Sequence, residues 1–233
     1  MSTMVNRAIG LDGVVAAETA LSHVDGLAGR LVIAGSDVEE LSQKATFEAV
    51  ACRLWELADG QIRAQGDIGK ARVSAFALVP ALLNSAKGMA PIDGLRLGFA
   101  SLSAVAGLAP EIVVTGAAPV FAAALSRAAE GNTPIAPDPS ALHAADTLRM
   151  LTGDTPSPDK VRALNAYLVT VSDHSMNAST FAARVTASTQ ASMFASVTAA
   201  YCALTGPLHG GAPGPVLDQL DAIGGEQHIG AWL

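Results

Sequence analysis

The sequence predicts an all-α, multi-helical protein with a small β-hairpin near its N-terminus. Half of the 233 residues are hydrophobic, 15% are charged and 4% are aromatic. Such a chain has ample aliphatic surface to bury and too little charge to stay disordered. After Ser36 the apolar residues recur at helical spacing, in segments separated by glycine and proline. The length allows one large domain, or one domain with part of a second.

The hairpin is predicted around the Asp-Gly turn dipeptide at 25–26, which segments 11–21 and 30–34 flank as short strands. A helix is expected after Ser36, because a glutamate follows three residues later in the spacing of a capping box. Thr46 can cap the next helix. That helix would carry one apolar face made of Phe47, Val50, Leu54 and Leu57.

Further helices are predicted along the middle of the chain. Residues 68–86 are expected to form one helix kinked at Pro80, since proline removes a backbone donor and clashes with the preceding turn. Residues 91–107 and the alanine-rich stretch 110–130 are predicted to be two more helices. The run 131–140 holds four turn-forming residues and is predicted to be a loop.

Clear start and stop signals mark the last helices. The Ser-Pro-Asp sequence at 157–159 supplies a cap, a first-turn proline and an acid near the positive end of the helix dipole. The helix that it opens is expected to reach residue 171. Asn177 can cap the following helix, the Gly-Pro pair at 206–207 is a stop signal, and Pro215 can open one more helix.

The charge balance argues against nucleic acid as a partner. The formal net charge is −7, whereas proteins that bind phosphate backbones are usually basic. Membrane insertion is not expected, although no charged residue lies between Arg184 and Asp218, because polar side chains interrupt this stretch. Its many alanine, serine and threonine residues are typical of helices packed closely together, including across a subunit interface.

The two cysteines, Cys52 and Cys202, lie far apart, each inside an apolar, helix-like segment. Both are predicted to be reduced thiols in the core of a cytoplasmic protein. The N-terminal residues contain no apolar run of signal-peptide length, which supports the same compartment.

Two of the five histidines stand in unusual settings, His174 in SDHSMNAST and His209 in GPLHGGAPG. The glycines and prolines around His209 let the backbone approach a ligand closely and hold the ring at a helix junction. The other three, His23, His143 and His228, are interpreted as structural or surface residues. No G-x-S-x-G elbow or glycine-rich phosphate loop is present. The histidines and cysteines also lack the spacing of a zinc site, so no metal is expected.

Four segments resemble, in order, stretches of the citrate synthase family: GVVAAETALSHVDGLAGRLVIAGSDVEEL, DPSALHAADTLRMLTG, SDHSMNASTFAARV and GPLHGGAPGPVLDQLDAIG. The resemblance runs from about Gly10 to the last residue, and the pair D-H-x-x-N-A-S-T with G-P-L-H-G-G-A is specific to that family. It implies a mainly helical dimer that condenses an acyl-CoA with a 2-oxo acid and hydrolyses the resulting thioester.

The same motifs imply roles for three residues. His174 would hydrogen-bond oxaloacetate, with Asn177 in the same binding site, and His209 would donate to the thioester carbonyl oxygen and stabilise the enol. A donor placed where negative charge grows lowers the barrier more than it aids binding. No cofactor is expected, because coenzyme A enters as the thioester substrate; the residues that bind it are unknown.

In family members a catalytic aspartate, another histidine and several arginines lie downstream of His209. This sequence has no arginine after Arg184, so half of the expected site is missing from it. Two departures are smaller: Ser175 stands where many members carry Glu, and Pro213 where many carry Asn. Arg149 and Arg184 are the remaining cations of the matched motifs and are interpreted as structural ion-pair residues.

The resemblance also predicts that the chain turns back between the two histidines. One helix over 177–205 would be about 40 Å long at 1.5 Å per residue, and His174 and His209 could not then share a small substrate. The polar run 188–192 is the expected break. It would give two antiparallel helices with both histidines at the same end.

Residues 1–213 are therefore predicted to be the N-terminal part of a citrate synthase-like large domain, and 214–233 the start of the small domain. The predicted activity is the condensation of acetyl-CoA with oxaloacetate to citrate and CoA, incomplete in this chain alone. The expected partners are a second copy in a homodimer or a complementing C-terminal chain. Two alternatives stay open: a 2-methylcitrate synthase that uses propionyl-CoA, and a non-catalytic binding or regulatory subunit derived from citrate synthase.

Overall fold

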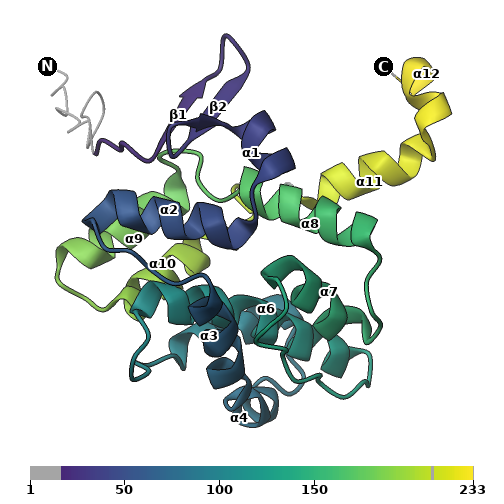
Figure 1. The fold of residues 1–233 in the computed structure, drawn as a ribbon. Coiled ribbons are helices and arrows are strands. Elements are labelled where there is room, and N and C mark those ends of the chain that lie inside the picture. The colour runs from purple at the N-terminus through teal and green to yellow at the C-terminus, as the bar shows by residue number, and fades with distance from the viewer. Residues whose placement is uncertain (1–16, 211–212, 233) are drawn as a thin grey trace, which may run out of the picture.

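A small antiparallel sheet opens the described part of the chain, which covers residues 17–210 and 213–232 of a computed structural model (Figure 1). The predicted hairpin is present, but its first strand follows residue 21 instead of occupying 11–21, of which residues 11–16 lie outside the described part. The sheet also has a third strand, which the sequence did not predict. Its strands are β1 (Ser22–Asp25), β2 (Arg30–Ile33) and β3 (Ser36–Asp37), in that spatial order.

Helices make up nearly all of the remaining structure, so the predicted all-α class with a small N-terminal β element is confirmed (Figure 1). They are α1 (Val38–Lys44), α2 (Phe47–Asp59), α3 (Gly66–Phe76), α4 (Val79–Ser85), α5 (Pro91–Ala100), α6 (Pro110–Ala129), α7 (His143–Thr152), α8 (Pro158–Thr170), α9 (Ala178–Ser188), α10 (Met193–Leu204), α11 (Pro213–Ile223), the 3-10 turn Glu226–His228 and α12 (Ile229–Trp232).

Side-chain caps fix the starts of several helices. Thr46, Ser157 and Asn177 cap α2, α8 and α9 as predicted, each accepting a hydrogen bond from a backbone N–H in the first turn. At α1 the prediction was wrong: Asp37, not Ser36, is the cap, and its Oδ1 accepts from the Glu39 N–H at 3.0 Å. Ser36 lies one residue before the cap and pairs with Ile33 of β2.

Pro80 and Pro213 lie at helix starts, whereas Pro119 lies inside α6. The predicted kinked helix over 68–86 is two helices, α3 and α4, with Pro80 in the first turn of α4. A first-turn proline lacks only an N–H that would have no partner in the helix. For the same reason α11 begins at Pro213 rather than at Pro215. The helix predicted over 91–107 ends earlier, at Ala100.

The long helix α6 is the centre of the main hydrophobic core. Its residues pack against α3, α4, α5 and α7, and glycines allow the closest approaches. A Cβ on Gly116 would lie 2.6 Å from the Cβ of Ala71 in α3, and one on Gly98 of α5 would lie 2.6 Å from the Phe121 ring in α6. Within the described residues α6 alone is long and apolar enough to cross a membrane, but 61% of that window is buried in the fold, as in a core helix.

A second, smaller core joins the sheet to two helices. Ile33 of β2, Val50 and Leu54 of α2, and Val169 of α8 are buried against one another. Asn165 strengthens the contact, since its side chain accepts from the Phe47 N–H and donates to the Ala45 carbonyl, both at 2.9 Å. This core holds α8, and therefore the loop that follows it, firmly against the sheet.

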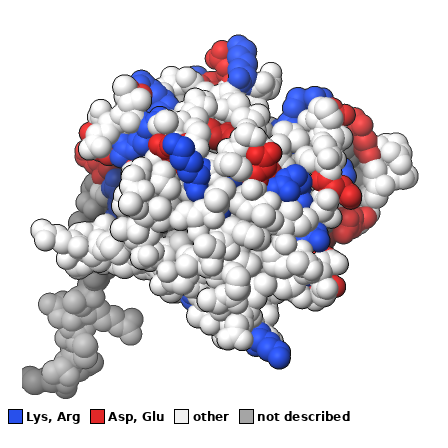
Figure 2. Space-filling model, turned by 60° about the horizontal axis from the view of Figure 1, so that its bottom comes forward, with Lys and Arg blue, Asp and Glu red and all other residues white. Residues whose placement is uncertain are grey.

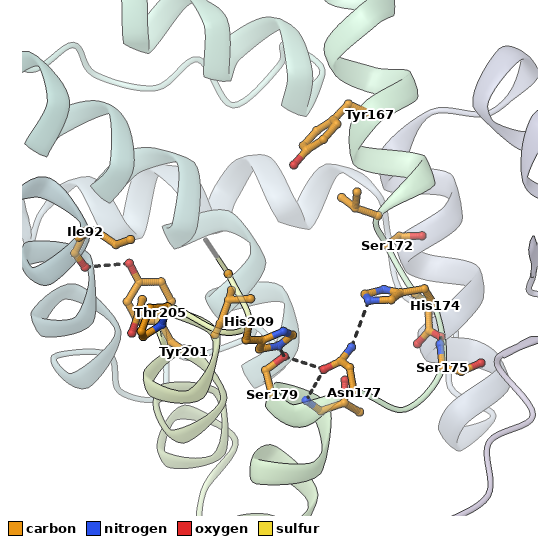
Figure 3. A pocket seen from close by; sticks show the side chains of 16 residues that line it. Ile92, Tyr167, Ser172, His174, Ser175, Asn177, Ser179, Tyr201, Thr205 and His209 are labelled. Atoms are coloured by element: carbon orange, nitrogen blue, oxygen red, sulfur yellow. Dashed lines mark hydrogen bonds between the residues drawn. The ribbon is translucent and has the colours of Figure 1, made fainter. Parts of the chain in front are cut away.

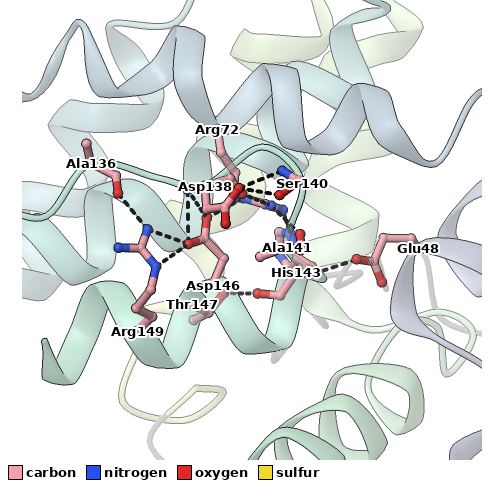
Figure 4. Close-up of polar contacts among 10 residues, drawn as sticks. All are labelled: Glu48, Arg72, Ala136, Asp138, Ser140, Ala141, His143, Asp146, Thr147 and Arg149. Carbon is pink, nitrogen blue, oxygen red and sulfur yellow. Dashed lines mark hydrogen bonds and ion pairs between the residues drawn. The ribbon is translucent and has the colours of Figure 1, made fainter. Parts of the chain in front are cut away.

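A buried polar cluster, the Arg72 cluster, ties α3 to α7 and the loop before it (Figure 4). The Arg72 Nε lies 2.8 Å from Asp146 Oδ2, and its Nη2 donates to two backbone carbonyl groups of the 138–141 loop. Arg149 pairs with the other oxygen of Asp146 at 2.6 Å, which confirms the ion pair predicted for Arg149. Arg184 is different: it donates to the Glu18 carbonyl at 3.1 Å, and no ion pair of it is found among the described residues.

The two cysteines are not both core thiols. Neither forms a disulfide in the described part of the chain, but Cys52 is half-buried and Cys202 is exposed. The prediction of a core position was wrong for Cys202 because α10 is apolar on most of its surface, including parts that face outward.

Candidate active site

The two singled-out histidines, His174 and His209, lie in one cavity of about 860 Å³ (Figure 3). The predicted break between them is confirmed, because α9 ends at Ser188 and α10 begins at Met193. The two helices pack against each other. His174 in the loop before α9 and His209 in the loop after α10 therefore reach the same end of the helix pair.

A chain of hydrogen bonds connects the two rings (Figure 3). Asn177 Nδ2 lies 3.2 Å from His174 Nε2. The Ser179 hydroxyl donates to Asn177 Oδ1 at 2.7 Å and lies 3.0 Å from His209 Nε2. Four residues from two loops and one helix N-terminus thus form one polar wall.

The hydrogen bonds of this wall favour one proton position on each imidazole ring in the free protein. Asn177 Oδ1 caps α9 by accepting from the Thr180 N–H at 2.9 Å, so the amide nitrogen of Asn177 must face His174. His174 Nε2 is therefore an acceptor. Because the Ser179 hydroxyl donates to Asn177, it can only accept from His209 Nε2, which carries the proton. The free rings are held as opposite tautomers, and Nδ1 of His209 is the nitrogen left for a ligand.

Apolar and aromatic side chains line other parts of the cavity. Tyr167, Tyr201 and Leu204 are among them. The Tyr201 hydroxyl donates to the Ile92 carbonyl at 2.8 Å, and its ring packs at a tilt on Phe99. Burial raises the pKa of Tyr201 above its ordinary value, so this tyrosine stays neutral. The cavity thus has one hydrogen-bonding wall and apolar parts suited to the carbon skeleton of a ligand.

The structure brings together all three residues predicted for the site, His174, Asn177 and His209. Ser179 was missed as a functional candidate although it lies in the quoted D-H-x-x-N-A-S-T motif. The sequence could have indicated Ser179 by its position two residues after the cap Asn177. That position places its side chain in the first turn of α9, beside the capping oxygen. The described residues hold no group of three His, Cys, Asp or Glu side chains placed to bind a metal.

Comparisons with known proteins identify the family of this chain. The family described as "Citrate synthase, C-terminal domain" matches residues 10–233. The chain belongs to the citrate synthase family. It is 34% identical to the citrate synthase of Deinococcus radiodurans, over 95% of this chain and 62% of that protein. It is 32% identical to a 2-methylcitrate synthase of Mycobacterium tuberculosis, over 96% of this chain and 60% of that protein.

Solved citrate synthases share the fold. The Thermotoga maritima citrate synthase superposes with a TM-score of 0.75 at 30% identity, covering 96% of this chain and 63% of the other. The Thermoplasma acidophilum citrate synthase, solved as a ternary complex with carboxymethyl coenzyme A and oxaloacetate, has a TM-score of 0.76 at 22% identity, covering 96% and 62%. The chain thus spans about 62% of the length of the citrate synthases that it matches.

Proposed function

We propose that this chain supplies the histidine-bearing part of an active site that condenses acetyl-CoA with oxaloacetate to give citrate and CoA. The observation that carries the proposal is the hydrogen-bonded chain from His174 through Asn177 and Ser179 to His209 along one wall of the cavity. The order of the motifs along the sequence does not by itself require these four side chains to lie together in space.

In the proposed reaction His174 and Asn177 bind the oxo acid, and His209 acts on the thioester. As the methyl proton of acetyl-CoA leaves, negative charge grows on the carbonyl oxygen. A donor already aimed at that oxygen stabilises the transition state more than the substrate. For Nδ1 of His209 to donate, the ring must carry its proton on Nδ1 instead of Nε2. The Ser179 hydroxyl would then turn from Asn177 and donate to Nε2. No residue of this chain is assigned as the base that removes the methyl proton.

Two other activities remain to be separated from this one. A 2-methylcitrate synthase would use propionyl-CoA, and the curated relatives include enzymes with either name at almost equal identity. A non-catalytic binding or regulatory subunit would keep the polar wall for an oxo acid without turnover. The chain's share of its relatives' length is compatible with each, and with a complementing C-terminal chain.

The domain boundary near residue 213 is also part of the proposal. Helices α11 and α12 extend away from the helical body in Figure 1. Three large apolar side chains of α11 are more than half exposed: Val216, Leu217 and Leu220. Exposed apolar helices of this kind are typical of a segment that packs with another domain, which supports 214–233 as the start of a small domain.

A homodimer is the proposed assembly, and nucleic acid and membranes are not proposed as partners. Figure 2 shows a region in the lower middle of one face that is nearly free of Lys, Arg, Asp and Glu, whereas charged residues gather along the top and the right of the same face. The sequence has no charged residue between Arg184 and Asp218, a stretch that includes all of α10. Faces without charge favour close helix packing between subunits. The cytoplasmic location stays a prediction.

The test of the proposed function is thiol release from acetyl-CoA in the presence and absence of oxaloacetate, repeated with propionyl-CoA. It should be run on the 233-residue chain and on the full product of its gene. We expect thiol release that needs both substrates from the full product, and no release from the 233-residue chain alone. His209→Ala should lower kcat by about 100-fold, as expected for the loss of a donor to a developing oxyanion, whereas His23→Gln, an exposed side chain that lines no part of the cavity, should not change it.

The outcome also separates the alternatives. Faster turnover with propionyl-CoA would favour the 2-methylcitrate synthase. Oxaloacetate binding that His174→Ala abolishes, without thiol release in either form of the protein, would favour the binding subunit. Neither binding nor release would refute the proposed function.

A further inference from the structure

Ser22, the first residue of β1, connects the sheet to the loop that carries His174. It is 8% exposed and is the one buried polar residue of the described sheet. Its hydroxyl donates to Oδ1 of Asp173, which lies 151 residues later in the sequence. It also accepts from the Ser175 N–H at 2.8 Å. One hydroxyl group thus holds the residues on both sides of His174.

Two further contacts close this junction. The Ser175 N–H also lies 3.1 Å from Asp173 Oδ1, so the carboxylate and the Ser22 hydroxyl share it. Because the Ser22 hydrogen goes to the carboxylate, the Ser175 hydroxyl must donate in its own contacts, at 3.1 Å to Ser22 Oγ or at 3.4 Å to the Ser22 carbonyl. Each donor of the junction has an acceptor.

The loop has a conformation that requires such bonds. Ser175 has a φ of +69°, in the left-handed region that residues with a side chain adopt only when the surrounding structure holds them there. The next residues run into Asn177, whose capping bond fixes the start of α9. The backbone on either side of His174 is therefore held by Ser22 at one point and by the α9 cap at the other.

The strand that provides Ser22 is itself firmly anchored. Ser22 pairs with Ile33 of β2, which is fully buried in the smaller core together with Val169 of α8. The segment just before β1 is attached as well, since Arg184 of α9 donates to the Glu18 carbonyl at 3.1 Å. Residues 18–22 thus contact both the His174 loop and the helix that follows it.

We propose that Ser22 is a positioning residue for His174: its hydroxyl, through Asp173 and Ser175, sets the orientation in which the His174 ring meets Asn177. Ser22 lines no part of the cavity and acts only through the loop. The consequence for oxo acid binding rests on the proposed function, but the effect on the ring does not.

The first experiment reads the ring directly, in the absence of substrate. Two-bond ¹H–¹⁵N correlation spectra of ¹⁵N-histidine-labelled chain report which imidazole nitrogen carries the proton, and His174→Gln assigns the His174 signals. We expect a single Nδ1–H tautomer for His174 in the wild type. Ser22→Ala should move its ¹⁵N shifts toward the averaged values of a free imidazole, and Ser22→Thr, which keeps the hydroxyl, should restore them.

The matched control is Ser42→Ala, which removes a serine hydroxyl from the same N-terminal region. Within the described residues, that hydroxyl hydrogen-bonds only to the Glu39 carbonyl. It should leave the His174 signals unchanged. The His209 signals should stay in place in every variant, which separates loss of positioning from general unfolding. Should Ser22→Ala fail to fold, Asp173→Asn provides the second variant, since it keeps the size of the side chain and weakens the acceptor.

The second experiment measures oxo acid use by the full gene product. Ser22→Ala should raise KM for oxaloacetate about tenfold, the effect of losing one hydrogen bond to a charged group, and change kcat less than about twofold. Unchanged His174 signals in Ser22→Ala would overturn the positioning role. Shifted signals in a protein that binds no oxo acid would support the positioning role and refute the proposed function, so the two failures are distinct.

Discussion

His143 is the histidine whose protonation should control the stability of the fold. It is buried, its ring stacks on Phe47 with 4.9 Å between centroids, and its Nδ1 lies 3.3 Å from Arg72 Nη1. Burial, and to a lesser extent the charge of Arg72, lowers the pKa of His143 to about 3, whereas in the unfolded chain the pKa is about 6.5. The folded state therefore binds this proton more weakly. Stability should fall as the pH drops from about 6.5 toward about 3, by up to about 1.4 kcal/mol per pH unit.

Urea unfolding between about pH 7 and about pH 4 tests this expectation. The wild type should lose free energy of unfolding steeply over that range, and His143→Gln should show a flatter dependence because its side chain does not titrate. His23→Gln, an exposed position in β1, should keep the wild-type slope. Equal slopes in all three proteins would show that carboxylates alone govern the acid response.

At the scale of residues, the sequence revealed the site better than the buried polar cluster. His174 and His209 could be predicted because each lies in a loop at a helix end. His174 comes shortly before the cap Asn177, and His209 stands among glycines, so neither side chain is expected to pack in the helical core. Arg72 and Glu48 gave no signal, since helical periodicity assigns charged residues to the outer face. Glu48 is nevertheless buried and accepts from the His143 N–H at 2.6 Å, capping α7 from another helix.

At the scale of elements, the contact between α3 and α6 depends on a missing side chain. A Cβ on Gly116 would lie 2.6 Å from the Ala71 Cβ, 2.9 Å from the Arg72 nitrogen and 2.9 Å from the Ile68 carbonyl oxygen. Two of these three atoms are backbone, so α3 would have to move. We expect Gly116→Ala to destabilise the fold by about 1–3 kcal/mol, although alanine favours a helix over glycine by about 1 kcal/mol.

Gly66, in the first turn of α3, is the matched control. A Cβ there meets no atom within 4 Å, so Gly66→Ala should be neutral or stabilising. Urea unfolding of both variants gives the comparison. If Gly116→Ala were as stable as Gly66→Ala, the close approach of α3 and α6 would not contribute to the packing.

The boundaries of elements were predictable where a local signal decides them. Thr46, Ser157 and Asn177 marked helix starts correctly because capping depends on residues within one turn. The first strand was placed too early because pairing is decided across the sheet: β1 lies opposite β2, and Ser22 is held by a loop far away in the sequence. The predicted break between the two histidines came from the family resemblance and not from helix propensity.

At the scale of the whole molecule, the distribution of charge supports association of two chains. The charge-free stretch after Arg184 includes α10, whose exposed residues include Met193 and Leu204. A monomer that exposes such helices to water would be prone to aggregation. The alanine, serine and threonine residues of this stretch predicted close helix packing, including across a subunit interface, but they could not show which helices carry the exposed apolar surface.

A charge on α10 should weaken the proposed dimer without weakening the fold. Met193 is the first residue of α10 and is exposed. Glutamate there interacts favourably with the helix dipole, so Met193→Glu should fold as well as the wild type. Light scattering over a dilution series should give twice the chain mass for the wild type, and Met193→Glu should dissociate at about tenfold higher concentration. Leu27→Glu, at the exposed hairpin turn, should behave like the wild type. A monomeric wild type would contradict the dimer, and an unchanged Met193→Glu would exclude α10 from the contact.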